Sequence, residues 1–232
     1  MSFTFSPLSE GAIVIEAGTE INAAVQKKIR AIAALLEERP PVWMVEFIPA
    51  FTTVAVFYNP LAASYETAKT VLGELLEQLG EAAEAPSRTV EIPVCYGGEF
   101  GPDLDFVAEH NGLTPEQVIE IHTSGTYSVS MIGFAPGFPF ISGMSEKIAA
   151  PRRDTPRLRI PERTVGIAGK QTGVYPIETP GGWQLIGRTP IRLFRPEQAI
   201  PSLLRAGDTV VFRRITEADY NAWEEEPNAE DH

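Results

Sequence analysis

The sequence predicts an α+β protein in two parts: a ferredoxin-like domain in residues 1–86 and a β-barrel domain in residues 87–216, followed by an acidic tail in residues 217–232. In the first part, strand-like segments alternate with two segments of helical periodicity. After His122 the chain becomes short runs rich in β-branched and aromatic residues, separated by Gly and Pro, a pattern typical of a barrel or sandwich. The last 16 residues carry seven Asp/Glu and no Lys/Arg, which indicates a solvated tail.

The N-terminal part is predicted to follow the split βαβ order, β-α-β-β-α-β, with both helices on one face of a small antiparallel sheet. Thr19 can cap the first helix, and the Pro40–Pro41 pair ends it. Gly80 is the expected stop of the second helix. The expected elements are a strand at 12–17, a helix at 19–38, two strands within 42–58, a helix at 64–80 and a strand at 89–94.

The barrel part is predicted to open with two short helices. The second of these has Thr114 at its cap, Pro115 at its first position and Gln117 at its third, which together form a capping box. The strands that follow are short and irregularly spaced, so they do not suggest βαβ units. The helices are expected at 101–112 and 114–122, and the strands at 127–134, 165–169, 173–178, 183–189, 191–194 and 208–215.

Composition excludes several classes of function. The net charge of −12 argues against a nucleic-acid partner, because phosphate contacts need clustered positive charge. The start of the chain does not have the character of a signal peptide, and apolar runs are broken by Pro, Gly or charge, so no membrane span is expected. With Cys95 as the only cysteine, no internal disulfide is possible, which favours a reducing, cytoplasmic location. Cys95 is interpreted as a buried filler rather than a nucleophile.

Two polar positions are candidates for chemistry. His122 closes a capped helix, where a positive charge is favoured by the helix dipole, so a structural and a functional role both remain open. No second His and no cysteine cluster stands at metal-ligand spacing, and no metal is expected. The segment "GIAGKQTG" fails the P-loop spacing but leaves a looser polar role open for Lys170 and Gln171.

Three further segments have two interpretations each. Five arginines between residues 152 and 163, Arg157 among them, suit carboxylate or phosphate recognition, or form a surface loop paired with acids. The stretch "GFAPGFPF" either closes a core corner or forms the wall of a site. "TPGGWQLIGRT", with Trp183, Arg188 and Thr189, lines a small-molecule site or makes a tight corner. Asp103 is interpreted as a helix-start acid that complements the dipole.

The order of these motifs resembles one family. "IPVCYGGEFGPDLDFVA", "LTPEQVIEIH", "GFAPGFPF" and "VGIAGKQTGVYPIETPGGWQLIGRT" follow one another as in the KipI family, also called allophanate hydrolase subunit 1 or the B-type 5-oxoprolinase subunit. The resemblance runs from Ile13 to Phe212. It implies a cyclophilin-like barrel, a companion protein of the C-type 5-oxoprolinase or allophanate hydrolase subunit 2 class, and a third protein of the LamB/YcsF type. Such complexes use ATP to cleave 5-oxoproline to glutamate, and one branch of the family instead inhibits a sensor histidine kinase.

The resemblance therefore favours a non-autonomous subunit of an ATP-hydrolysing cyclic-amide hydrolase. The alternatives are a KipI-like regulator and, from barrel shape alone, a prolyl isomerase. The expected catalytic residues are His122 as proton shuttle, Lys170, Gln171 and Arg188. The expected substrate-binding residues, which share one concave face of the barrel, are Phe134, Pro136, Phe138, Arg157, Tyr175, Trp183 and Thr189.

Overall fold

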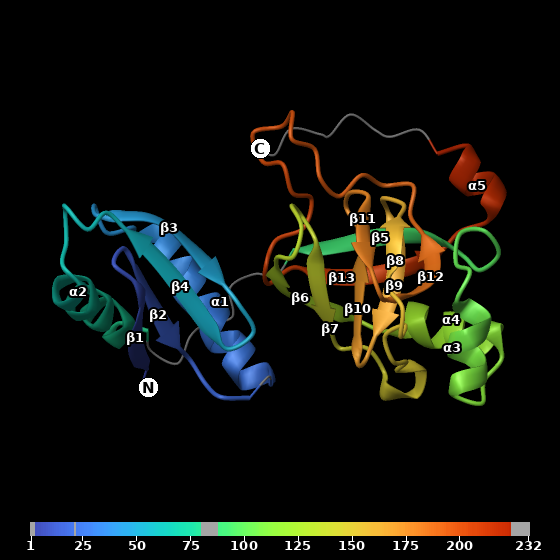
Figure 1. Ribbon diagram of the computed structural model, residues 1–232, viewed down its shortest axis with the longest axis horizontal. Helices are drawn as coiled ribbons and strands as arrows, with labels where there is room; N and C mark the ends of the chain where they lie inside the picture. The colour runs from blue at the N-terminus through green and yellow to red at the C-terminus, as the bar shows by residue number, and fades with distance from the viewer. Residues whose placement is uncertain (1–2, 21, 80–87, 224–232) are drawn as a thin grey trace. The chain divides into compact units, whose positions relative to one another are not determined.

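A computed structural model describes residues 3–20, 22–79 and 88–223 and divides the chain into two compact units, Met1–Ser87 and Arg88–His232. Each unit has its own hydrophobic core. Figure 1 shows a two-layer α/β unit at the N-terminal end of the sequence and a barrel in the remainder. The predicted helix stop at Gly80 and the end of the acidic tail lie outside the described residues.

The N-terminal unit is a four-stranded antiparallel sheet in the order β1-β2-β4-β3, covered on one face by two helices (Figure 1). Alternate residues of the two central strands point toward the helices: Ile13 pairs with Val56 and Ile15 with Val54, and all four are fully buried. The elements are β1 Thr4–Ser9, β2 Ala12–Glu16, α1 Ala23–Glu38, β3 Met44–Pro49, β4 Thr53–Tyr58 and α2 Tyr65–Glu77.

The predicted β-α-β-β-α-β order is wrong, because the described order of this unit is β-β-α-β-β-α. The strand of this sheet that the sequence did not predict is β1, Thr4–Ser9. It carries Pro7 and two serines and so lacks a clear strand pattern. An edge strand tolerates such a sequence, since its outer backbone groups need no partner. The predicted last strand belongs to β5 Thr89–Tyr96 and lies in the barrel.

Both helices of this unit are set by their caps and apolar stripes. Helix α1 begins after Asn22, not Thr19: the Asn22 side chain accepts a 2.9 Å bond from the Val25 backbone N–H. Ser64 caps α2 in the same way, through the Thr67 N–H. The buried stripe of α1 is Val25, Ile29, Ile32 and Leu36, and that of α2 is Ala68, Leu72 and Leu76.

The C-terminal unit is a closed seven-stranded barrel in the order β10-β7-β6-β13-β5-β12-β9 (Figure 1). Closure depends on β5, which pairs in parallel with β13 over six residues and antiparallel with β12. The predicted strand at 191–194 is not part of the barrel, because only Phe194 makes a bridge, to Ser202. The remaining barrel strands are β6 Tyr127–Ile132, β7 Pro139–Ser142, β9 Thr164–Ala168, β10 Gln171–Val174, β12 Gln184–Arg188 and β13 Thr209–Arg214.

Helices and a small sheet surround the barrel. Helices α3 Leu104–His110 and α4 Pro115–Ser124 contact each other and the barrel strands, and the predicted capping box of Thr114 and Gln117 is present. Strands β8 Arg157–Ile160 and β11 Thr179–Gly181 form a separate two-stranded sheet, and a short 3₁₀ turn spans Glu146–Ile148. Within the segment predicted as an acidic tail, Glu217–Asn221 form α5, in which no residue is buried. Thr216 and Asp219 make its capping box, and the Tyr220 ring lies 4.7 Å from that of Phe100.

Candidate functional site

An aromatic cluster lies on the outer face of the barrel. The ring of Phe138 is the centre of this cluster, 5.2 Å from the ring of Tyr175, 5.5 Å from that of Trp183 and 5.1 Å from that of Phe140. The ring of Phe138 also lies 5.4 Å from that of Phe134. All four of these ring contacts of Phe138 are edge-to-face. Strand alternation explains why Tyr175 lies on the outer face. Thr172 and Val174 of β10 point into the barrel, and Tyr175, the next residue, points the other way.

Two glycines let the indole of Trp183 approach the barrel wall closely. A Cβ at Gly173 would stand 3.0 Å from a ring carbon of Trp183 and 3.1 Å from one of Phe138. A Cβ at Gly166 would stand 3.2 Å from Cβ of Trp183. All three distances are tighter than ordinary packing, so any larger residue at these positions would push the aromatic side chains away from the wall.

The loop of "GFAPGFPF" is a tight turn rather than an extended wall. Gly133 N–H donates to Phe138 O at 3.0 Å, and Phe138 N–H donates to Ala135 O at 3.0 Å. Phe138 is 1% exposed, whereas Phe134 is 67% exposed and Pro136 is also exposed. The loop therefore buries one aromatic side chain and presents another to the surroundings.

Burial also governs the chemistry of Tyr175. Burial raises the pKa of Tyr175 to about 12, against smaller opposing effects of the Trp183 backbone N–H, Arg152 and Arg157. The phenol is thus neutral at physiological pH and acts as a hydrogen-bonding group.

Arg188 ends β12 at the level of this cluster. It pairs with Thr164 of β9, and Tyr175 N–H donates to Thr164 O at 2.9 Å, so Arg188 and Tyr175 flank the same residue on the outer face. The Nε of Arg188 donates to the Glu162 carbonyl at 3.0 Å. Thr189, the next residue, is fully buried, and its hydroxyl accepts from the Ile191 N–H at 3.3 Å.

Arg157 is engaged in a buried ion pair. Its two Nη atoms each lie 2.8 Å from one carboxylate oxygen of Asp103, a bidentate contact, and Arg153 contacts the same carboxylate at 3.3 Å. Asp103 is 6% exposed and also accepts from the Leu185 N–H at 2.7 Å. Asp103 stands at the start of α3, as the sequence indicated, but its side chain makes no cap bond and instead anchors β8 to the barrel.

Lys170 and Gln171 are not brought to the aromatic rings by any described contact. Lys170 lies in the turn between β9 and β10, exposed, with its Nζ 2.6 Å from a Glu146 oxygen. Gln171 begins β10 opposite Ala168, half-buried. Ring contacts join Phe134, Phe138, Tyr175 and Trp183, and their convergence with Arg188 on one concavity stays a prediction.

His122 lies on the other side of the wall, inside the barrel. It is fully buried, and its ring stands 4.4 Å from that of Phe212. Nδ1 lies 2.8 Å from the Tyr96 hydroxyl and Nε2 lies 3.0 Å from the Thr172 hydroxyl. Since the single Thr172 proton is donated to the Gly166 carbonyl at 3.0 Å, Nε2–H must be the donor to Thr172, and Nδ1 accepts from Tyr96.

The interior location determines how His122 titrates. Burial lowers its pKa to about 3, so the ring is neutral at physiological pH. A buried neutral imidazole with both nitrogens engaged fits a structural role better than the predicted proton shuttle.

We predict a pH-dependent stability from this residue. The unfolded His122 binds a proton near pH 6.5 and the folded one near pH 3, so the unfolded state holds more protons between these values and stability falls as pH drops below 6.5. The loss between pH 7.5 and 5 is roughly 2 kcal/mol by linkage. Urea unfolding across this range should show the slope, and His122→Gln should remove it; an unchanged slope in the variant would contradict the assignment.

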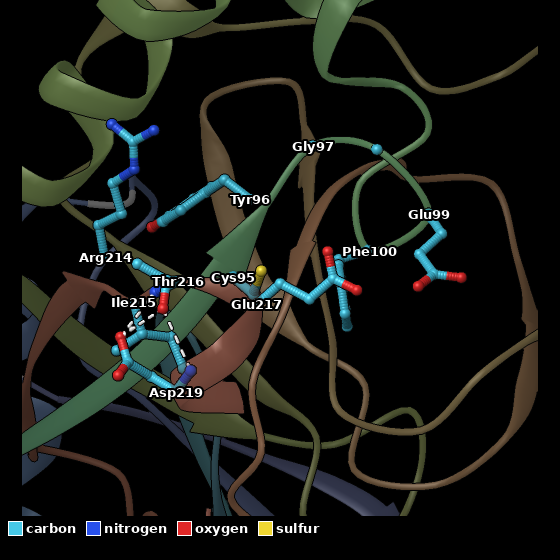
Figure 2. A pocket seen from close by; sticks show the side chains of 11 residues that line it. Cys95, Tyr96, Gly97, Glu99, Phe100, Arg214, Ile215, Thr216, Glu217 and Asp219 are labelled. Carbon is cyan, nitrogen blue, oxygen red and sulfur yellow. Dashed lines mark hydrogen bonds between the residues drawn. The ribbon is translucent and has the colours of Figure 1, made fainter. Parts of the chain in front are cut away.

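A pocket of about 470 Å³ lies elsewhere on the barrel (Figure 2). It is bordered by the ends of β5 and β13, the loop through Gly97 and Gly98, and α5. Its lining contains none of the predicted site residues. The full lining is Cys95, Tyr96, Gly97, Gly98, Glu99, Phe100, Arg214, Ile215, Thr216, Glu217 and Asp219.

The charge of this pocket disfavours phosphates. Three carboxylates, Glu99, Glu217 and Asp219, face one cation, Arg214, which is already paired with Glu116. The Cys95 thiol is held in its neutral form: burial raises its pKa, Glu217 and Glu99 add to the rise, and Arg214 opposes it. Cys95 therefore has the character of the predicted buried filler.

Sequence reasoning named Arg163 only as one of five arginines, and it missed the double pairing of Asp103 and the pocket. The adjacent Gly97 and Gly98, both with positive φ, were the available signal for the pocket loop. Over the described residues, no cluster of three or more His, Cys, Asp or Glu side chains could hold a metal ion. The same residues include no helix both long and apolar enough to cross a bilayer.

Known proteins and protein families match this chain over most of its length. Residues 3–204 match the family model described as carboxyltransferase domain, subdomain C and D. The B-type 5-oxoprolinase subunit of Bacillus subtilis (strain 168) is 53% identical over 97% of this chain and 98% of its own length. A structure of a conserved protein from Pyrococcus horikoshii is 44% identical over 94% of this chain and all of that chain, with a TM-score of 0.56. The TTHA0988 structure matches 88% of this chain, but only 40% of its own, at 33% identity and a TM-score of 0.78.

Proposed function

Because the chain belongs to the family of B-type 5-oxoprolinase subunits, we propose that it is one component of an ATP-dependent 5-oxoprolinase, a complex that opens 5-oxoproline to glutamate. The observation that carries the proposal is the 53% identity to the Bacillus subtilis B-type protein across almost the full length of both chains. The matched carboxyltransferase family model supports the same class of small amide or carboxyl chemistry.

The reaction explains the use of ATP. The five-membered lactam is stabilised by amide resonance, so its carbonyl carbon is a poor target for water. Transfer of the γ-phosphoryl group to the carbonyl oxygen creates a phosphate ester and releases ADP. Water adds to the activated carbon, the C–N bond breaks to open the ring as a free amine, and a second water hydrolyses the resulting acyl phosphate to the carboxylate of glutamate and phosphate. The protein contributes donors and cations placed where negative charge develops.

The chain supplies one wall of the proposed site. The outer aromatic cluster presents Phe134, which is 67% exposed, above the buried rings of Phe138, Tyr175 and Trp183, and Arg188 is proposed to add a cation. Small-molecule sites commonly combine such a surface with a few fixed polar groups. Gln171, exposed Lys170 and the buried Thr189 are proposed as polar contributors only in the assembled complex, where Pro136 extends the wall beside Phe134.

The rest of the site is proposed to come from companion proteins. The described part of this chain brings no nucleophile and base together at the aromatic cluster, and His122 is turned into the barrel. We propose a homologue of the C-type 5-oxoprolinase subunit or of allophanate hydrolase subunit 2, and a LamB/YcsF-type protein, as these partners, with a cyclophilin-like barrel as the shared scaffold. TTHA0988, in which the matching region is 40% of one longer chain, supports the idea that such a unit works beside further domains. The proposed location of the complex is the cytoplasm, where ATP is available.

Complementation tests the proposal in cells. A Bacillus subtilis strain lacking its own B-type protein is expected to lose growth on 5-oxoproline as nitrogen source and to regain it when this chain is supplied. The Bacillus B-type protein itself is the positive control. Restoration by the control but not by this chain, with both proteins present at equal level, would contradict the proposed function.

A further inference from the structure

Two non-glycine residues in the described part of the chain adopt left-handed backbone: Phe134 with φ of 70° and Arg163 with φ of 68°. An L-residue in this region brings its Cβ against the following carbonyl, which costs free energy. Such strain persists only where the surrounding structure imposes it, and it collects at functional sites. Glycine or asparagine would serve a purely structural turn at lower cost.

One row of residues crosses the barrel wall, with a neighbour of Phe134 at one end and a neighbour of Arg163 toward the other. Gly173 pairs with Phe140, Val174 with Val165, and Arg188 with Thr164. Extending these pairings one or two residues beyond the strand ends brings Phe138 opposite Tyr175 and Tyr175 opposite Thr164. Phe138, Tyr175, Thr164 and Arg188 therefore form one row across β7, β10, β9 and β12. Arg163 immediately precedes Thr164, and Phe134 packs edge-on against Phe138. We call Arg163 and Arg188 the strained rim, after the left-handed backbone at Arg163.

The backbone of Arg163 is fixed on both sides. Its N–H donates to the Tyr175 carbonyl at 2.5 Å, and its carbonyl accepts from the Thr189 N–H at 2.9 Å. Its Nη1 donates to the Pro190 carbonyl at 2.9 Å. The turn is therefore held by two neighbouring strands, and the guanidinium is held at the barrel edge with it.

The two guanidiniums of the strained rim are anchored to one turn. Arg188 Nε donates to the carbonyl of Glu162, and Arg163 Nη2 lies 3.2 Å from the carboxylate of the same residue. The Arg163 side chain is 26% exposed and that of Glu162 is 43% exposed. A partly desolvated guanidinium binds an anion more strongly than a surface one, and the more exposed Glu162 can turn into water when another carboxylate takes its place.

We propose that Arg163 and Arg188 bind the carboxylate of 5-oxoproline. The inference rests on the proposed function, from which the identity of the carboxylate follows. 5-Oxoproline carries one carboxylate, which matches two cations anchored to one turn. The guanidinium fork suits the two oxygens of a carboxylate.

Substitution by glycine separates function from structure at this rim. Arg163→Gly removes the guanidinium and the backbone strain together. The Tm of the chain is expected to stay equal or rise, while the KM for 5-oxoproline in the reconstituted complex rises at least tenfold and the KM for ATP is unchanged. Arg188→Gln is expected to raise the same KM. Arg159→Gln is the matched control, since Arg159 is 78% exposed and pairs with Glu178 outside the rim.

The outcomes are distinguishable. A wild-type complex that consumes no 5-oxoproline with ATP refutes the proposed function and, with it, this assignment. An active complex in which Arg163→Gly and Arg188→Gln both leave the KM for 5-oxoproline within twofold overturns the subsite alone. A rise in the KM for ATP instead shows that the rim binds phosphate, and the carboxylate assignment is then wrong. If Arg163→Gly lowers the Tm, a change in its KM could come from misfolding. The KM of Arg188→Gln for 5-oxoproline then decides whether the rim binds the carboxylate.

Discussion

Replacement of Trp183 by alanine is expected to lower the free energy of unfolding of the barrel unit by roughly 3–5 kcal/mol, the usual cost of removing a buried indole. Trp183 is 5% exposed and lies between Phe138, Phe140 and the glycine-lined wall. Neighbouring rings are held by the barrel and by β8, so they cannot collapse fully into the cavity.

Urea unfolding followed by circular dichroism measures this effect. Because the chain has two compact units, the transition of the barrel must be resolved from that of the N-terminal unit. Phe134→Ala is the matched control, an aromatic side chain from the same cluster that is 67% exposed and is expected to cost less than about 1 kcal/mol. Equal losses for the two variants would contradict the picture of a buried indole under an exposed phenyl ring.

The second large effect is expected at the ion pair that anchors β8. Asp103→Asn removes the charge from a 6% exposed carboxylate that receives Arg157, Arg153 and the Leu185 N–H. Breaking a buried pair by removing one partner costs about 3–5 kcal/mol, and we expect about 3 kcal/mol here because both arginines keep some contact with water. Thermal and urea unfolding measure the loss.

A surface pair from the same strand provides the comparison. Arg159→Gln breaks the contact with Glu178, both partners being half or more exposed, and should change stability by less than about 1 kcal/mol. A loss at Asp103 no larger than that at Arg159 would show that the anchor is not energetically distinct from a surface pair.

The sequence predicted those parts of the fold that have a local signal. Hydrophobic periodicity predicted the apolar stripes of α1 and α2 and most barrel strands, and cap residues predicted the capping box at Thr114. Barrel closure has no such signal, because it pairs β5 with β13 across a long stretch of intervening sequence. The edge strand Thr4–Ser9 was missed because Pro7 and its serines resemble a turn, so β5 was placed in the wrong sheet.

The candidate site was predictable in part for the same reason. Aromatic and glycine residues cluster along the sequence near residues 133–140 and 166–187, which indicated a shared surface for Phe138, Tyr175 and Trp183. The partners of arginines are set by tertiary structure, so Arg157 could not be assigned to Asp103 from spacing. The left-handed turn at Arg163 was not predicted because it uses neither Gly nor Asn, the residues by which such turns are recognised.

The central claim is that this chain is one indispensable part of an ATP-dependent 5-oxoprolinase. The most direct measurement follows glutamate and ADP formation from 5-oxoproline and ATP, with the purified chain and its two proposed companion proteins together and with each protein left out in turn. We expect equal amounts of glutamate and ADP from the full mixture and neither product from the chain alone or from the mixture without it. Full turnover by the companions without this chain, or none by the complete mixture while the Bacillus subtilis proteins are active in parallel, would contradict the claim.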